Sequence, residues 1–234
     1  MNKSLCLLSL ASAFCFVGNA IAQEAPPPAT TAAPPARVGF QMALRTGYAV
    51  PMGYARGGAG GADLAMSDGF SGQVPIFMEI GGKVIPNLFL GGYLGLGFGG
   101  PAGEFDTLCN SGGLTCVAVG FRIGAEIQYH ILPGEMTNPW VGYGIGFESL
   151  ALGMSQGGQS WTDSYSGLEF AHLMGGIDFR LNRIFGIGPF VDYSIGDYTT
   201  YHIEDPGFAT VDGDIQVTRT HEWLAFGVRG TFFP

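Results

Sequence analysis

Four histidines, His130, His172, His202 and His221, are the side chains of this sequence best suited to acid–base chemistry. A hydrolase or acyltransferase would need one of them beside a serine nucleophile and an acid that orients the imidazole. No histidine lies in a compact motif with serine, and solvated or wall-lining positions are the ordinary ones for isolated histidines. The sequence therefore predicts no catalytic residue, no cofactor site and no metal site.

The glycines of the segment 95–100 (GLGFGG) satisfy the G-x-G-x-x-G motif of dinucleotide-binding turns. That motif needs a helix directly after it, and the following Pro101-Ala-Gly-Glu has no helical period. Residues 84–103 carry no charge and also contain a G-x-x-x-G spacing at 91–95, which in a membrane helix would favour pairing. Seven glycines, two prolines and a clear alternation favour a strand instead. In a narrow barrel, such small residues would make room for Tyr93 and Trp140.

The N-terminus has the pattern of a cleaved signal peptide. Lys3 precedes an apolar stretch at 5–17, and Ala20-Ile21-Ala22 is a small-x-small cleavage pattern. Cleavage is expected between Ala22 and Gln23, so residues 1–22 are the signal peptide. Residues 23–36 hold five prolines and no large apolar side chain, which predicts a disordered spacer.

Cys109 and Cys116 are the two cysteines that remain after removal of the signal peptide. They flank Asn-Ser-Gly-Gly-Leu-Thr, which has turn composition, in a protein directed to an oxidising compartment. The spacing predicts a local Cys109–Cys116 disulfide.

Composition restricts the class of protein further. The net charge of −9 is unlike the basic footprint of a nucleic-acid-binding protein, so no nucleic-acid partner is expected. A hydrophobic content of 47% excludes disorder throughout the chain. With only 12% charged residues and a mean hydropathy of +0.26, the chain is typical of a membrane protein.

Apolar and polar residues alternate with a period of two in eight segments between residues 37 and 234. Long connections are expected near 51–72, 100–116, 150–164 and 198–219, and tight ones near 85–87, 132–139 and 182–184. An even number of strands with long loops at one end and short turns at the other is typical of outer-membrane barrels. The expected fold is all-β: a closed eight-stranded antiparallel up-and-down transmembrane β-barrel over 37–234, with both ends on the periplasmic side.

Charged residues in the predicted strands take the phase opposite to the apolar ones, which points them into a polar, filled lumen. Five acids and five bases form this predicted network, and their balance favours mutual pairing; they are Arg45, Glu79, Lys83, Arg122, Glu126, Glu148, Asp178, Arg180, Asp192 and Arg229. Glu169 and Glu222 fall on the apolar phase and are expected at the outer rim, where charge costs less. A soluble barrel would reverse this arrangement.

Residues 139–148 (PWVGYGIGFE) and 224–234 (LAFGVRGTFFP) resemble the small eight-stranded OmpA/OmpX/OmpW-like outer-membrane barrels. The resemblance covers about residues 37–234 and implies the outer membrane of a Gram-negative bacterium, reached with the help of the barrel assembly machinery. It also implies an assembly signal in the last strand, at Leu224, Phe226, Val228 and Phe232. Here Phe233 and Pro234 follow the aromatic residue on which the family usually ends.

The predicted outer loops and rim hold twelve acids against two bases, Arg56 and Arg219. Ten of the acids are in the loops: Asp63, Asp68, Glu104, Asp106, Asp163, Asp197, Glu204, Asp205, Asp212 and Asp214. A solvated surface is the simplest interpretation, and divalent bridging to lipopolysaccharide is the alternative.

The expected function is a structural or surface-interaction role of a non-enzymatic, monomeric protein in contact with outer-membrane lipid and lipopolysaccharide. A narrow gated channel for small solutes or ions is the first alternative, and a lipid A-modifying enzyme is the second.

Overall fold

The computed structural model describes residues 38–58, 63–205 and 210–233. The signal peptide, the spacer and the cleavage site at Ala22 and Gln23 lie outside the described residues. Within them, the elements in chain order are β1 (Gly39–Arg56), β2 (Leu64–Ala65), α1 (Met66–Gly69), β3 (Phe70–Ile85), β4 (Leu88–Pro101), α2 (Gly103–Gly112), β5 (Thr115–His130), β6 (Thr137–Gln156), β7 (Gln159–Arg180), β8 (Phe185–Glu204), β9 (Val211–Asp214) and β10 (Thr220–Phe232). Neither helix among these residues is long and apolar enough to cross a membrane.

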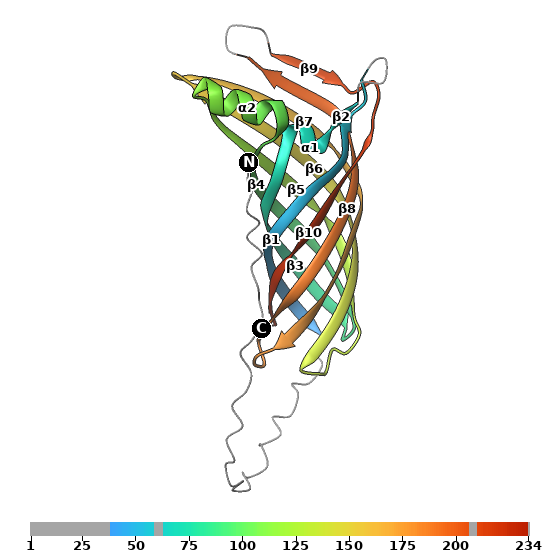
Figure 1. Ribbon diagram of the computed structural model, residues 1–234. Helices are drawn as coiled ribbons and strands as arrows, with labels where there is room; N and C mark the ends of the chain where they lie inside the picture. Colours follow the sequence, from blue (N-terminus) through green and yellow to red (C-terminus); the bar gives the residue numbers. More distant parts are fainter. Residues whose placement is uncertain (1–37, 59–62, 206–209, 234) are drawn as a thin grey trace, which may run out of the picture. The chain divides into compact units, whose positions relative to one another are not determined.

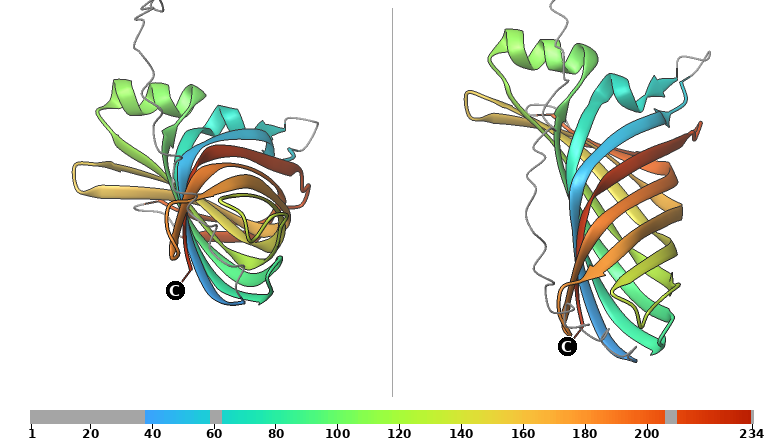
Figure 2. Two further views of the ribbon diagram at one scale, coloured as in Figure 1. Left: turned by 90° about the horizontal axis from the view of Figure 1, so that it is seen from below. Right: turned by 60° about the horizontal axis from the view of Figure 1, so that its bottom comes forward.

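Eight of the strands form a closed antiparallel ring (Figures 1 and 2). The order is β1-β3-β4-β5-β6-β7-β8-β10, and β10 pairs with β1 from Met42↔Phe232 to Gly53↔His221. The short strands β2 and β9 lie outside the ring, paired with β1 and β8. The predicted eight-stranded up-and-down barrel is therefore confirmed.

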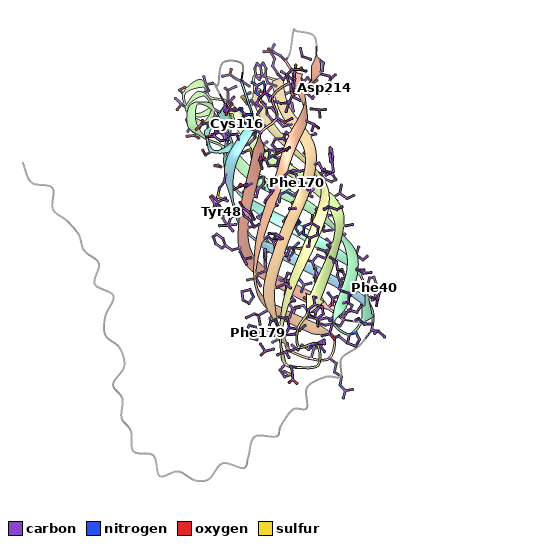
Figure 3. All side chains as sticks on the ribbon, turned by 90° about the vertical axis from the view of Figure 1, so that its right-hand side faces the viewer. Phe40, Tyr48, Cys116, Phe170, Phe179 and Asp214 are labelled. Atoms are coloured by element: carbon purple, nitrogen blue, oxygen red, sulfur yellow. A yellow bond between two sulfur atoms is a disulfide. The ribbon has the colours of Figure 1, made fainter. Side chains whose placement is uncertain are left out.

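The outside of the barrel is apolar and the inside is charged. Leu44 and Ile145 are about half exposed on the exterior, whereas Arg45, one residue further along β1, is fully buried inside. A surface of this kind is stable only where the surrounding medium is lipid. Figure 3 shows Phe40 and Phe179 toward the end with the short turns, and Asp214 at the opposite, outer end.

One of the predicted long loops is almost entirely strand in the structure, and another is strand over about half of its length. The segment 150–164 is the outer extension of the β6–β7 hairpin, which pairs as far as Gln156↔Gln159 and turns through Gly157 and Gly158, both with positive φ. Part of 198–219 likewise belongs to β8 and β9. These extensions lack the apolar alternation that a membrane imposes, because both of their faces lie above the lipid.

A helix does follow the glycine-rich segment, contrary to the sequence prediction. Helix α2 runs from Gly103 to Gly112 and is capped by Gly113, which takes a left-handed conformation with φ of 66°. The glycines of the motif, however, lie inside β4, where Gly95 faces the ring of Phe77. They provide room for side chains in the lumen, and β4 pairs antiparallel with β5, so a dinucleotide-binding crossover does not form.

The glycines also make room for Tyr93, as the sequence predicts. A Cβ at Gly124 or Gly146 would lie 2.4 Å from the hydroxyl oxygen of Tyr93, and one at Gly144 would lie 3.1 Å from its ring. Trp140 occupies similar space beside Gly176. Bare backbone on these strands therefore allows large side chains to cross the narrow lumen.

Candidate functional site

The middle of the lumen is crossed by paired charges. Arg45 Nε lies 2.5 Å from Glu79 Oε1, and the same guanidinium also binds Asp192. Arg229 lies 2.7 Å from the other oxygen of Glu79 and 2.8 Å from Asp178 Oδ2. These five side chains are almost completely buried, and they come from β1, β3, β7, β8 and β10. Each ion pair joins strands that are adjacent or two places apart in the ring. Gln128 of β5 extends the network to the opposite wall, because its side-chain oxygen accepts a hydrogen bond from Arg229 at 2.8 Å.

Toward the outer end, a second cluster is centred on Glu148. Its Oε2 lies 3.3 Å from Arg122 and 3.2 Å from His221 Nε2. Its Oε1 accepts hydrogen bonds from the hydroxyl of Tyr198 at 2.7 Å and from the indole N–H of Trp223 at 2.9 Å. Glu148 therefore has every oxygen satisfied, as a buried carboxylate requires.

Glu169 lies inside the lumen, which corrects its predicted place at the rim. The side chain is fully buried, accepts a hydrogen bond from the Tyr93 hydroxyl at 2.5 Å and lies 3.6 Å from Arg122. The cause is an extra residue in β7. The pairing of β7 with β6 shifts between Gly144 and Gly146, and its pairing with β8 shifts between Glu169 and Ala171, so the inward and outward positions of β7 are exchanged there. Adding Glu169 to the five predicted acids gives six against five bases. Glu222 remains outside the lumen, half-buried.

Cysteine labelling checks the position of Glu169. We expect Glu169→Cys to resist a lipid-soluble maleimide in folded protein, because the side chain is enclosed by the barrel wall. Phe170→Cys, one residue further on the lipid side, should react readily, since Phe170 is 39% exposed. Both should react fully after unfolding. Equal labelling of the two folded variants would contradict the reversed phase.

The periplasmic end of the lumen is closed by aromatic and basic side chains. Phe233 turns inward, 7% exposed, with its ring 4.8 Å from the Arg180 guanidinium and 5.4 Å from the Lys83 ammonium. Arg180 also donates to the Pro133 carbonyl at 2.8 Å. Glu126 of β5 is buried nearer the middle of the lumen, in the field of Glu79, Arg45 and Arg229, and forms no ion pair within the described residues. All ten charged residues of the predicted network are buried, with 0% to 7% exposed.

An apolar cluster closes the outer end, a feature that the alternation does not reveal. Met66 of α1 is fully buried there, beside Phe70 at the start of β3 and Ile215 just after β9. Leu150, Tyr165 and further side chains from the barrel wall complete the cluster. Residues from the outer connections are therefore folded inward over the charged lumen.

The four histidines divide between the lumen and the outer surface. His130 and His172 are fully buried in the lumen wall. His221 is also buried, with 1% exposed, and stacks on Tyr198 with ring centroids 3.9 Å apart. His221 lies two residues before the buried Trp223 on β10, so its side chain points into the lumen on the same face of the strand. His202 alone among them is well exposed.

The remaining predicted residues are the two cysteines, at the outer end of the barrel, and the assembly signal, along its last strand. Cys109 of α2 and Cys116 of β5 form a disulfide that ties the helix to the wall. The predicted assembly-signal residues all lie on β10, with Phe226, Val228 and Phe232 exposed to lipid and Leu224 half-buried.

Few of the outer acids are paired with bases in the described residues. Arg219 Nε lies 3.0 Å from Asp63 Oδ2 and links two outer connections. Burial raises the pKa of Asp163 on the outer part of β7, and the positive charge of Arg56 opposes that effect. The outer surface is therefore strongly acidic, as the sequence predicts.

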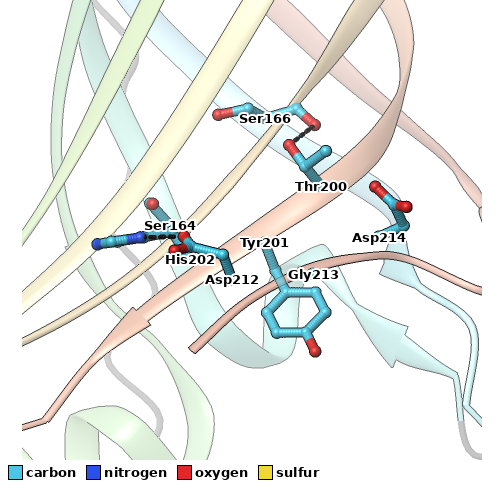
Figure 4. A pocket seen from close by; sticks show the side chains of 8 residues that line it. All are labelled: Ser164, Ser166, Thr200, Tyr201, His202, Asp212, Gly213 and Asp214. Atoms are coloured by element: carbon cyan, nitrogen blue, oxygen red, sulfur yellow. Dashed lines mark hydrogen bonds and ion pairs between the residues drawn. The ribbon is translucent and has the colours of Figure 1, made fainter. Parts of the chain in front are cut away.

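Sequence reasoning overlooked Ser164. It lies on the outer part of β7 in a pocket of about 400 Å³, together with His202 and Asp212 (Figure 4). His202 Nδ1 lies 2.5 Å from Asp212 Oδ1. No local motif signals the arrangement, because the three residues come from three strands.

An apolar exterior, a charged interior, short turns at one end and long hairpins at the other define an outer-membrane β-barrel. Neither a scan of protein-family models nor a search of curated proteins finds a match to the sequence. Among solved structures, the chain is similar to a Neisserial surface protein, NspA, with 15% identity and a TM-score of 0.42 over 81% of this chain and 95% of that one. It is also similar to OprG of Pseudomonas aeruginosa, with 11% identity and a TM-score of 0.46 over 85% of this chain and 98% of that one. A third similar structure is the outer-membrane protease OmpT of Escherichia coli, with 9% identity and a TM-score of 0.39 over 83% of this chain and 97% of that one. At such identities the likeness concerns overall architecture alone.

Proposed function

We propose that the protein is a closed, non-conducting outer-membrane barrel whose role is structural or interactive and is carried by its outer surface. The observation behind this proposal is the closure of the lumen at successive levels. Phe233 with Arg180 and Lys83 fills the periplasmic end, and the apolar cluster around Met66 fills the outer end. Between them lie the buried ion pairs of Arg45 and Arg229 and the hydrogen bond from Arg229 to Gln128 on the opposite wall.

The nature of the closure favours a permanent plug over a gate. Opening the middle of the lumen would separate Arg45 and Arg229 from their carboxylates in a region of low dielectric constant. Separating even one buried pair costs about 3–5 kcal/mol. A channel that opens readily would need weaker contacts at its constriction than these.

The outer surface supports an interactive role. The β6–β7 hairpin continues past the apolar band, and β9 and both helices lie at the same end (Figure 1). These elements bear outer acids that include Asp68, Asp163 and Asp214, and they stand where lipopolysaccharide or a basic partner would meet the barrel. We include in the proposal a monomeric state and insertion by the barrel assembly machinery through β10.

Conductance measurements test the closure. Folded protein, verified by faster gel migration of the unheated sample, should give no unitary conductance above background in a planar bilayer. Cells that lack the protein should likewise take up nitrocefin at the wild-type rate. Reproducible conductance steps, or slower uptake in the deletion strain, would favour the channel alternative.

A further inference from the structure

We propose that Ser164, His202 and Asp212 form an ester-hydrolysing site on the exterior of the outer extension. The inference goes beyond the proposed function, because a closed lumen neither requires nor excludes it. The residues lie in one row across three neighbouring strands: Ser164 of β7 pairs with His202 of β8, and His202 pairs with Asp212 of β9. Directly opposite residues on one face of a sheet have Cβ atoms about 5 Å apart. Figure 4 shows the three side chains grouped at one side of the pocket.

The hydrogen bond between His202 and Asp212 selects one tautomer of the neutral imidazole. A carboxylate only accepts, so Nδ1 of His202 carries the proton and donates it to Asp212 Oδ1. Nε2 is then left with a lone pair that can accept the proton of a serine hydroxyl. Nucleophile, base and orienting acid thus follow one another in the order that serine hydrolases use.

A bulge in β8 places His202 on the exterior. Gly167 pairs with Tyr198 but Ser166 pairs with Thr200, so Thr199 is an extra residue. Tyr198 is buried inside the barrel, and without the extra residue His202 would share its inward phase. Tyr201 instead packs against the inner apolar cluster, as Tyr165 of β7 and Ile215 after β9 do. Residues adjacent to these, including His202, therefore face outward.

The position of the row indicates the class of substrate. Along the exterior of β7, the apolar Phe170 and Leu168, 39% and 57% exposed, give way to Ser166 and Ser164. The edge of the lipid band therefore lies near Leu168, and Ser164 is about 13 Å further along the strand. That is the level of lipid headgroups in the outer leaflet. The substrate that meets this face is an acyl ester of a membrane amphiphile.

The reaction balances as two acyl transfers. Ser164 Oγ bonds to the ester carbonyl carbon while its proton passes to His202 Nε2. The bond between the carbonyl carbon and the alcohol oxygen breaks, and the leaving alcohol takes that proton. Water then attacks the acyl-serine and gives a proton to Nε2, which returns it to Ser164 as the carboxylic acid leaves. Asp212 keeps the imidazole oriented and stabilises its positive charge throughout.

The neighbouring row supplies a matched control within the same pocket. Ser166 pairs with Thr200, and Thr200 pairs with Asp214, so this row has a threonine where the first has histidine. Ser166 has the same strand and face as Ser164, about 7 Å nearer to the lipid, but it has no base opposite it, and its hydroxyl donates to Ser149 at 3.0 Å. A serine-specific reagent should therefore distinguish two hydroxyls that differ mainly in their partner.

A fluorophosphonate probe on the full-length folded protein in lipid vesicles tests the proposal. We expect labelling that mass spectrometry maps to Ser164 and that Ser164→Ala abolishes. His202→Gln should slow labelling at least 100-fold and Asp212→Asn at least 10-fold, while Ser166→Ala leaves it unchanged. Unlabelled wild-type protein, or labelling that survives His202→Gln, would overturn the proposal. Gel mobility of unheated samples verifies folding of each variant.

Acyl release identifies the source of the ester. Vesicles with radiolabelled lipopolysaccharide and vesicles with radiolabelled phospholipid alone are incubated in parallel with wild-type protein. Free fatty acid should appear with at least one of the two kinds of vesicle and should be absent with Ser164→Ala. The vesicles that release it identify the lipid that carries the ester. Release that Ser164→Ala does not reduce, or no release in either arm, would contradict the hydrolysis.

Discussion

Glu148→Gln is expected to lower the free energy of unfolding by about 3 kcal/mol. The substitution removes the charge that faces Arg122 and His221. It also sets a donating amide against the hydroxyl of Tyr198 or the indole N–H of Trp223, which are themselves donors. Breaking a buried ion pair while leaving its partners in place typically costs about 3–5 kcal/mol. Urea titration in lipid vesicles, followed by tryptophan fluorescence, measures the change.

Glu126→Gln is the matched control for that substitution. Glu126 is as deeply buried as Glu148 but forms no ion pair within the described part of the chain, and Gln128 is its near polar neighbour. Removing a buried charge that lacks a close partner relieves a desolvation cost. We therefore expect this variant to be at least as stable as the wild type. If both variants lost stability equally, the special role of the Glu148 contacts would be refuted.

Much of the barrel follows from the sequence because a membrane imposes a strict rule on each strand. Each strand has lipid on one side and a narrow lumen on the other, so successive side chains point alternately outward and inward. The inward direction of Arg45 or Asp192 can therefore be predicted from its apolar neighbours. Glu169 is an exception, because the register shift between Glu169 and Ala171 exchanges the inward and outward positions of β7 on its outer side. The sequence contains a sign of this in Leu168 and Phe170, which are out of phase with Leu173.

The outer end could not be predicted in the same way, because no lipid orders it. Met66 and Ile215 lie in polar connections, and only folding of those connections brings the two side chains into one cluster. Ser164 and His202 are likewise far apart in the chain, and their alignment depends on the bulge at Thr199. Strand register above the membrane is set by turns and bulges, for which a single sequence carries little signal.

The spacing of β7 and β8 near the periplasmic end depends on Gly188, and Gly188→Ala is expected to lower the free energy of unfolding by about 3 kcal/mol or more. A Cβ at this position would lie 1.6 Å from the backbone carbonyl oxygen of Ile177. Backbone cannot rotate away as a side chain does, so the two strands must separate locally. Overpacking of this kind costs about 1–3 kcal/mol where side chains can yield, and more where they cannot.

Gly186→Ala provides the comparison two residues away on the same strand and the same face. A Cβ there would meet its nearest atoms at 3.5 Å or beyond, which is ordinary van der Waals contact. This variant should therefore fold with wild-type yield and a stability within about 0.5 kcal/mol of the parent. Refolding yield by gel mobility, followed by urea titration of both variants, separates them. If Gly188→Ala proved as stable as Gly186→Ala, the close approach of β7 and β8 would not be a requirement of the closed barrel.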